Sequence, residues 1–206
     1  MIKGIILDFD GTLFHTDYLG KKVIVEICKE KGIDFDGVDW EKLPGLNRED
    51  RIKILFPDRV EELLLAYTKK YAEKFVKSLI ELGNSEKVIP RLAKKYKLFI
   101  FSTKYVELIK SALVAKDLLQ YFTEIIGYET LENKKPQPEG IFKIMKENTF
   151  SNKEIVLVGD SPLDKKACEN AKIKFILFNN SNEEKNLKNN LTIQNFLDLE
   201  EILDKL

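Results

Sequence analysis

Short apolar runs recur along this chain, and their spacing limits the possible folds more than any other feature. The runs lie at residues 2–7, 98–101, 124–127, 155–158 and 173–178, of which 124–127 is the weakest. Runs of this length, rich in β-branched residues, suit strands that are buried on both faces of a parallel sheet. Segments with helical spacing lie between them, as at 105–116 and 138–147, and this alternation indicates right-handed βαβ units. We therefore predict a doubly wound α/β sheet of five strands.

One long region interrupts this alternation. From about His15 to about Gly83 the sequence contains no good strand but two strong helical patterns. One pattern is an apolar stripe that repeats every four residues: Leu63, Tyr67, Tyr71, Phe75 and Leu79. Such a stripe needs a partner helix, and the apolar positions Val23, Ile24 and Ile27 supply one. We predict a core domain formed by residues 1–14 and 84–206, with an all-helical domain inserted at 15–83.

The composition favours a globular protein that binds small molecules. A chain of 206 residues with 44% hydrophobic residues is long enough for one core domain and a modest insertion. Lysine and arginine total 34 against 34 acidic residues, so no net positive field attracts nucleic acid or an anionic membrane. The first apolar run is too short for a signal sequence, and no later run is long enough to span a bilayer. We expect a soluble cytoplasmic enzyme.

Two pairs of carboxylates follow apolar runs. Asp8 and Asp10 stand where the first run ends, and Asp160 and Asp164 follow the run at 155–158. In open α/β sheets, ligands bind at the carboxyl ends of the strands. Acids this close together are tolerable only if a cation lies between them or one of them holds a proton. Because His15 is the only histidine, a histidine-rich zinc or iron site is unavailable, and oxygen ligands favour Mg²⁺.

A tight turn is predicted directly after Asp10. Gly11 and Thr12 allow backbone N–H groups to point inward there, which is an arrangement that binds anions. The alternative is a hairpin turn at Asp10-Gly11. A hairpin needs a second strand at once, and residues 14–18 do not resemble one.

Two further polar residues are candidates for a phosphate site. Ser102 ends the run at 98–101, and Thr103 follows it where a helix is expected to begin, so a hydroxyl and helix amides meet there. The simpler interpretation is that Ser102 only caps that helix. Lys135 precedes Pro136 in a proline-rich segment that fixes the backbone and presents the ammonium at one place. The simpler interpretation of Lys135 is an ordinary solvated lysine.

Taken in order, these four elements resemble the motifs of the haloacid dehalogenase superfamily, over residues 2–178. Residues 8–13 resemble the first motif, Ser102 the second, Lys135-Pro136 the third and residues 159–164 the fourth. The resemblance implies a Rossmann-like core with a helical cap inserted just after the first motif. It also implies a small phosphorylated metabolite as the substrate and Mg²⁺ as the cofactor.

The resemblance assigns chemistry to the four acids. Asp8 would be the nucleophile, and Asp10 would protonate the leaving group and then activate water. The Asp8 carboxylate, the Asp10 main-chain carbonyl and the Asp160 carboxylate would hold Mg²⁺, with Asp164 in support. Carboxylate attack divides one difficult displacement into two easier ones, and Asp10 would serve both of them.

The resemblance also assigns the residues that would bind the transferring phosphoryl group. Ser102 and Lys135 would contact its oxygens, together with the backbone around Gly11, Thr12 and Thr103. Phosphoryl transfer depends chiefly on in-line positioning and on cations against the equatorial oxygens, so this assignment agrees with the chemistry.

Within the superfamily, the chain resembles small capped members such as phosphoglycolate phosphatase and β-phosphoglucomutase. Residues 43–50 resemble the substrate loop in the mutase cap, where Arg48 would bind an acidic group of the substrate. The alternative is that Arg48 is an exposed arginine at the start of a helix. Against a mutase, Gly159 stands where mutases of this type carry glutamate, and the cap position at which they use histidine has none. We therefore expect a phosphatase similar to phosphoglycolate phosphatase.

Two functions of other classes remain. A receiver-type signalling domain is also doubly wound and also phosphorylated on aspartate beside Mg²⁺, but its phosphorylated acid follows a middle strand and it has no cap. A catalytically silent binding protein on the same scaffold is disfavoured, because all the motif positions are filled. Phosphoglycolate, sugar phosphates, nucleotides and pyrophosphate are all candidate substrates.

Overall fold

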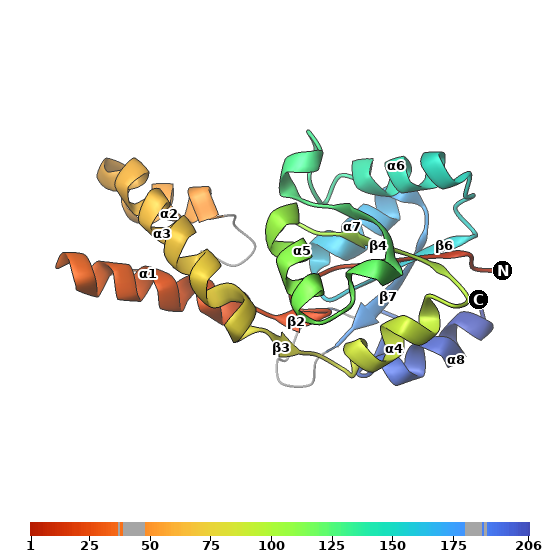
Figure 1. Cartoon of the computed structure of the whole chain (residues 1–206). Helices are drawn as coiled ribbons and strands as arrows, with labels where there is room; N and C mark the ends of the chain where they lie inside the picture. Colours follow the sequence, from red (N-terminus) through yellow and green to blue (C-terminus); the bar gives the residue numbers. More distant parts are fainter. Residues whose placement is uncertain (37, 39–47, 180–186, 188) are drawn as a thin grey trace. The chain divides into compact units, whose positions relative to one another are not determined.

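The computed structural model describes residues 1–36, 38, 48–179, 187 and 189–206 of the chain. The chain divides into two compact units (Figure 1). Met1–His15 and Ile80–Leu206 form the first, which we call the core unit, and Thr16–Leu79 form the second, the helical unit.

A six-stranded parallel sheet forms the centre of the core unit. Its strands in spatial order are β5 (Phe122–Ile126), β4 (Lys97–Phe101), β1 (Gly4–Leu7), β6 (Ile155–Gly159), β7 (Lys174–Phe178) and β8 (Thr192–Ile193). The five predicted strands are confirmed, and the sheet has the predicted doubly wound α/β character. β5 gave the weakest sequence signal because it lies at an edge and is only partly buried. β8 was missed because a two-residue strand carries no periodicity.

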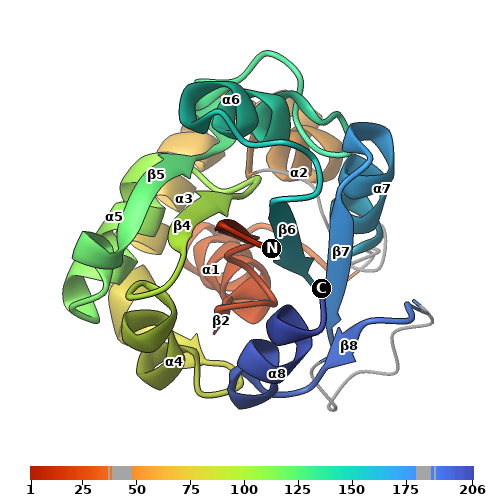
Figure 2. The same ribbon diagram turned by 90° about the vertical axis from the view of Figure 1, so that its right-hand side faces the viewer.

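Helices cover both faces of this sheet. Figure 2 shows α6 (Glu139–Asn148) and α7 (Pro162–Ala171) along one face, with α4 (Ser85–Leu92) and α8 (Leu199–Asp204) along the other. α5 (Val106–Ala115) connects β4 to β5. Short 3₁₀ turns lie at η4 (Leu119–Tyr121), η5 (Tyr128–Thr130) and η6 (Phe196–Asp198). The chain runs from β1 outward through β4 to β5 and then returns to β6, so the strand order reverses between β1 and β6, where ligands bind in such sheets.

The core unit is held together by apolar side chains between the sheet and its helices. Ile5, Ile6 and Leu7 of β1 are completely buried. Ile6 belongs to a cluster with Phe99 and Phe101 of β4 and with side chains of α6 and α7. Each such residue contributes about 1.5–3 kcal/mol by leaving water. This packing fixes the carboxyl end of β1, where the acidic motif begins.

A short antiparallel ribbon joins the two ends of the insertion. β2 (Phe14–His15) pairs with β3 (Ile80–Glu81), and the N–H of Leu82 donates to the carbonyl of Leu13 at 3.0 Å. We expected no strand between His15 and Gly83 and none at residues 14–18. Both expectations are wrong, because β2 and β3 lie at the two ends of this region. Each strand has only two residues, and its partner is distant in the sequence. The turn at Asp10-Gly11 nevertheless does not form a hairpin, because β2 pairs with β3 and not with β1.

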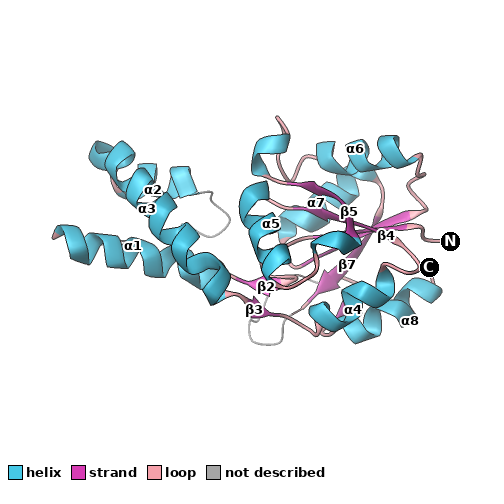
Figure 3. Cartoon of the chain, viewed as in Figure 1, coloured by secondary structure: helices cyan, strands magenta, loops and turns pink. Residues whose placement is uncertain are grey.

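The helical unit consists of α1 (Asp17–Lys31), α2 (Arg48–Leu55) and α3 (Val60–Phe75), with 3₁₀ turns at η2 (Pro57–Arg59) and η3 (Val76–Ser78) (Figure 3). The predicted stripe on α3 is buried from Leu63 to Phe75, while Leu79 lies beyond the helix and is half-buried. The predicted partner is confirmed, because α3 contacts α1, whose Val23, Ile24 and Ile27 are buried.

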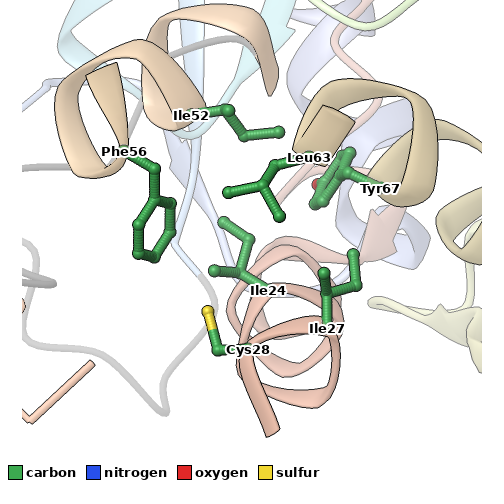
Figure 4. A pocket seen from close by; sticks show the side chains of 7 residues that line it. All are labelled: Ile24, Ile27, Cys28, Ile52, Phe56, Leu63 and Tyr67. Carbon is green, nitrogen blue, oxygen red and sulfur yellow. The ribbon is translucent and has the colours of Figure 1, made fainter. Parts of the chain in front are cut away.

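A small apolar pocket lies among these three helices (Figure 4). It is lined by Ile24, Ile27, Cys28, Ile52, Phe56, Leu63 and Tyr67. The lining offers almost no polar group, so the pocket is part of the hydrophobic interior of the helical unit.

No helix in the described part of the chain is long and apolar enough to cross a membrane.

Candidate active site

The predicted site residues of the core unit stand at the carboxyl ends of three neighbouring strands. Asp8 follows β1, Ser102 follows β4 and Asp160 follows β6. Asp164 lies in the first turn of α7, and Lys135 comes from the segment before α6. Parallel strands bring their carboxyl ends to one edge of the sheet, so residues far apart in the sequence meet there.

Lys135 connects two of the acids. Its Nζ donates to Oδ1 of Asp8 at 2.9 Å and to Oδ1 of Asp164 at 2.5 Å, and its side chain is only 2% exposed. The ammonium also lies 4.9 Å from the centre of the Phe101 ring. Burial lowers the pKa of Lys135, but the charges of Asp164 and Asp8 more than offset this, so its pKa is raised above the ordinary value. Lys135 is therefore a fixed buried cation and not a solvated surface lysine.

For Asp8, burial and neighbouring negative charges outweigh the effect of the nearby cation. The pKa of Asp8 is raised to about 8, chiefly by burial and further by the negative charges of Asp164 and Asp160, while Lys135 opposes the rise. Its backbone N–H donates to the carbonyl of Val158 on β6 at 3.0 Å, which fixes its position. An aspartate with so high a pKa indicates a surplus of negative charge in the site, and a bound cation would relieve it.

Carboxylate oxygens of Asp8, Asp160 and Asp164 lie within 4.8 Å of one another, and all three residues are buried. Oδ1 of Asp160 accepts a hydrogen bond of 3.1 Å from the hydroxyl of Thr12. Gly11 has φ +73°, and a Cβ there would collide with the Asp160 carboxylate, so the turn predicted after Asp10 requires this glycine. A hard divalent cation such as Mg²⁺ fits these oxygen donors.

Asp164 is held by its own helix. Ser161 is the N-cap of α7, and its N–H and hydroxyl both donate to Oδ2 of Asp164, at 3.1 and 2.5 Å. Lys135 occupies Oδ1, so both oxygens of Asp164 already have partners in the protein. The geometry suits Asp164 for positioning Lys135 and completing the negative charge of the site.

Ser102 is buried at the end of β4, and its N–H donates to the carbonyl of Ile126 on β5. Its hydroxyl accepts a 3.3 Å hydrogen bond from the N–H of Lys104. Helix α5 begins only at Val106, with Tyr105 as its N-cap. The predicted helical segment at 105–116 is confirmed as α5, but this helix begins a few residues after Thr103. The helix-cap interpretation of Ser102 is therefore wrong, and Ser102 instead closes a short turn. Thr103 lies half-buried in that turn.

Asp10 is more accessible than Asp8, with 23% of its side chain exposed. Its Oδ2 lies 3.1 Å from Nζ of Lys104, whose side chain is only 9% exposed. The sequence alone does not mark Lys104 as a site residue. Its one signal is its position two residues after Ser102, where the chain is expected to approach the acids.

Residues 5–178 match the family model described as haloacid dehalogenase-like hydrolase. The chain belongs to this family. It is 30% identical over 179 residues to the pyrophosphatase PpaX of Halalkalibacterium halodurans, covering 84% of this chain and 81% of that protein.

Solved structures share the fold of the whole chain. A predicted phosphoglycolate phosphatase of Haemophilus somnus superposes with a TM-score of 0.82 at 20% identity, covering 98% of each chain. CbbY of Rhodobacter sphaeroides, solved in complex with phosphate, superposes with a TM-score of 0.80 at 18% identity, covering 97% of this chain and 96% of that one. The expected haloacid dehalogenase-like fold and a hydrolytic enzyme of this family are confirmed, which excludes the receiver-type domain.

One family-specific position is explained by packing. At Gly159 a Cβ would lie 2.5 Å from Cγ of Asp164, so a glutamate, as in the mutases, does not fit beside Asp164 in this arrangement. The glycine at the end of β6 is therefore tied to the burial of Asp164.

Arg48 is the one predicted site residue outside the core unit. It is the first residue of α2 in the helical unit. The acids belong to the other unit, so the role of Arg48 in the site stays a prediction. The preceding part of the loop that resembles the mutase cap, residues 43–47, lies outside the described residues.

Proposed function

We propose that this chain is a Mg²⁺-dependent phosphatase that hydrolyses a small phosphorylated metabolite through an aspartyl-phosphate on Asp8. The observation that carries the proposal is the buried contact of 2.9 Å between Nζ of Lys135 and Oδ1 of Asp8. It keeps a cation beside the nucleophile, where the phosphoryl oxygens gather negative charge. The pyrophosphatase and phosphate-complex relatives support a phosphoryl-transfer chemistry.

The Asp8 carboxylate, the Asp10 carbonyl and the Asp160 carboxylate would hold Mg²⁺, with Asp164 in support. When bound, the ion neutralises the surplus of carboxylates and the charge of the phosphoryl group. Thr12 orients Asp160 for this task through its hydroxyl.

In the first step, an oxygen of Asp8 attacks phosphorus, and the bond from phosphorus to the leaving oxygen breaks. Asp10 gives its proton to that oxygen, which suits its partly exposed position two residues after the nucleophile. Lys135 and the Ser102 hydroxyl bind the non-bridging oxygens, together with backbone amides near Asp10 and Thr103. The N–H of Gly11 is not one of these amides, because it already donates to the carbonyl of Phe14 at 2.9 Å.

In the second step, Asp10 takes a proton from water while the water oxygen attacks phosphorus. The bond between phosphorus and the Asp8 oxygen breaks, inorganic phosphate leaves, and Asp8 is a carboxylate again. Each residue thus returns to its starting state after one turnover.

We further propose that the helical unit acts as the cap that selects the substrate, with Arg48 binding an acidic group remote from the scissile bond. Phosphoglycolate, sugar phosphates, nucleotides and pyrophosphate are all candidates. A mutase activity is disfavoured because mutases of this type carry glutamate at the position of Gly159, where a Cβ would collide with Asp164 in this chain.

A screen of the purified protein over a panel of phosphorylated metabolites tests the proposal. With Mg²⁺ we expect phosphate release from at least one compound, and none in EDTA. Asp8→Asn removes the nucleophile but is nearly isosteric, so kcat should fall by several orders of magnitude. Full activity in EDTA, or an Asp8→Asn variant with more than about 1% of wild-type kcat, contradicts the mechanism.

A further inference from the structure

The ion pair between Lys104 and Asp10 introduces a cation that the mechanism above does not use. Nζ of Lys104 lies 3.1 Å from Oδ2 of Asp10, whose carboxyl group gives its proton to the leaving oxygen in the proposed mechanism. The Lys104 side chain is nine-tenths buried, so its charge is only weakly screened by water. A leaving oxygen within hydrogen-bond distance of Asp10 is therefore also close to this ammonium.

The backbone of Lys104 is fixed on several sides. Its N–H donates to the Ser102 hydroxyl at 3.3 Å, and its carbonyl accepts from the N–H of Tyr128 at 2.9 Å. A Cβ at Gly127 would lie 2.6 Å from this carbonyl, so the absence of a side chain there permits the close approach. The Glu129 carboxylate accepts a hydrogen bond of 3.0 Å from the N–H of Val106, where α5 begins. The ammonium is thus presented from a rigid base, as a binding group must be.

We propose that Lys104 binds the leaving group and selects substrates whose leaving group is an anion close to the scissile bond, such as a diphosphate or the phosphate ester of a short hydroxy acid. This inference rests on the proposed phosphatase function. The Asp8 oxygen forms its bond to phosphorus, and the leaving oxygen keeps the electron pair of the broken bond and takes the Asp10 proton. With an anionic leaving group, a second negative charge lies beside that oxygen, and Lys104 pairs with it.

The alternative is that Lys104 only neutralises Asp10. The two roles differ in substrate dependence. A lysine that only neutralises Asp10 affects two substrates to the same extent when their leaving oxygens are equally basic, because both then need the Asp10 proton equally. A lysine that binds the leaving group affects substrates with an anionic leaving group much more than those with a neutral one.

Two pairs of substrates separate these roles in the Mg²⁺-loaded full chain. Pyrophosphate and 4-nitrophenyl phosphate have leaving groups of similar basicity, but that of pyrophosphate carries additional negative charge. Phosphoglycolate and ethyl phosphate both have a basic alkoxide leaving group, but only that of phosphoglycolate carries a carboxylate. The readout is the kcat/KM of each substrate with an anionic leaving group divided by that of its neutral partner. The variants are Lys104→Met, Lys104→Arg and, as a control, Lys110→Met at an exposed position of α5.

For at least one of the two anionic substrates, we expect Lys104→Met to lower this ratio by about fivefold or more, because a charge-assisted hydrogen bond is lost. Lys104→Arg keeps the charge and should preserve the ratio, as should Lys110→Met. If Lys104→Met lowers the kcat/KM ratio by less than this for both anionic substrates, the inference is overturned. A wild-type enzyme that hydrolyses 4-nitrophenyl phosphate but neither anionic substrate also overturns it. A wild-type protein that hydrolyses no phosphorylated compound with Mg²⁺ refutes the proposed function itself. Because every comparison is a ratio within one variant, partial loss of folded protein does not affect the result.

Discussion

Nζ of Lys135 lies 2.9 Å from Oδ1 of Asp8, in a site where both side chains are almost completely buried. The same ammonium bonds Asp164, so one cation is shared by two acids, with the third acid of the cluster, Asp160, close by. This arrangement joins the end of β1 to the first turn of α7. It makes the stability of the core unit depend on the same residue that would bind the phosphoryl group.

Lys135→Met should therefore destabilise the metal-free protein by about 3–5 kcal/mol at neutral pH, chiefly because it leaves the buried Asp164 carboxylate without its cation. Urea denaturation in EDTA measures the change. Lys143→Met is the control, because Lys143 forms a partly exposed ion pair with Glu124, and losing that pair should cost less than about 1 kcal/mol. Equal effects of the two substitutions would mean that the buried contact adds nothing to stability.

Stability should also depend on pH through Asp8. Its pKa is about 8 in the metal-free protein, against 3.8 for an ordinary aspartate, so between these values the folded protein binds more protons than the unfolded chain. The resulting stabilisation is fully present below pH 3.8 and is lost as the pH rises through about 8. The proposed Mg²⁺ site needs the ionised carboxylate, so metal binding should release a proton and become tighter as the pH rises.

The rise in Tm on adding Mg²⁺ should accordingly be larger at pH 8 than at pH 5, by about 2 °C or more. Thermal unfolding at both pH values, with Mg²⁺ and with EDTA, measures this difference. Asp8→Asn cannot titrate at this position, so its response to Mg²⁺ should change much less with pH. A wild-type response that is the same at pH 5 and pH 8 would remove Asp8 from the metal site.

Asp10→Asn should separate the two chemical steps. An amide still leaves the main-chain carbonyl in place, but it neither gives nor takes a proton. With an alkyl ester both steps should slow, by about 10²–10⁴-fold. With an activated aryl ester the first step should persist while hydrolysis of the aspartyl-phosphate stalls, because the leaving group needs little protonation.

Intact-protein mass spectrometry after an acid quench should then show one added phosphoryl group on Asp10→Asn, removable by hydroxylamine. The wild-type protein, treated in the same way, is the control. Turnover of aryl and alkyl esters at wild-type rates would show that Asp10 is not the acid-base residue.

Arg48→Ala should raise KM for the best substrate much more than KM for 4-nitrophenyl phosphate, which has no second acidic group. Steady-state kinetics on both substrates measures the difference. Lys53→Ala, on the same helix in an exposed ion pair with Glu49, is the control for general effects on α2. An equal rise for both substrates would make Arg48 a structural residue.

The sequence by itself determined the strands and the acids that follow them. The runs ending at Asp8 and near Asp160 were recognisable because a strand buried on both faces must be apolar throughout, which is a local signal. The partner stripes of α1 and α3 were recognisable for a similar reason, since helical periodicity shows which face is buried.

Only the tertiary structure decided which polar groups meet. The sequence did not show that Lys135 lies between Asp8 and Asp164, that Lys104 contacts Asp10, or that Gly159 makes room for Asp164. It also missed β2, β3 and β8, which are two residues long. Contacts of this kind depend on the order of the strands and on the packing of segments far apart in the chain. Because no periodicity within either segment records such a contact, it exists only once the sheet has formed.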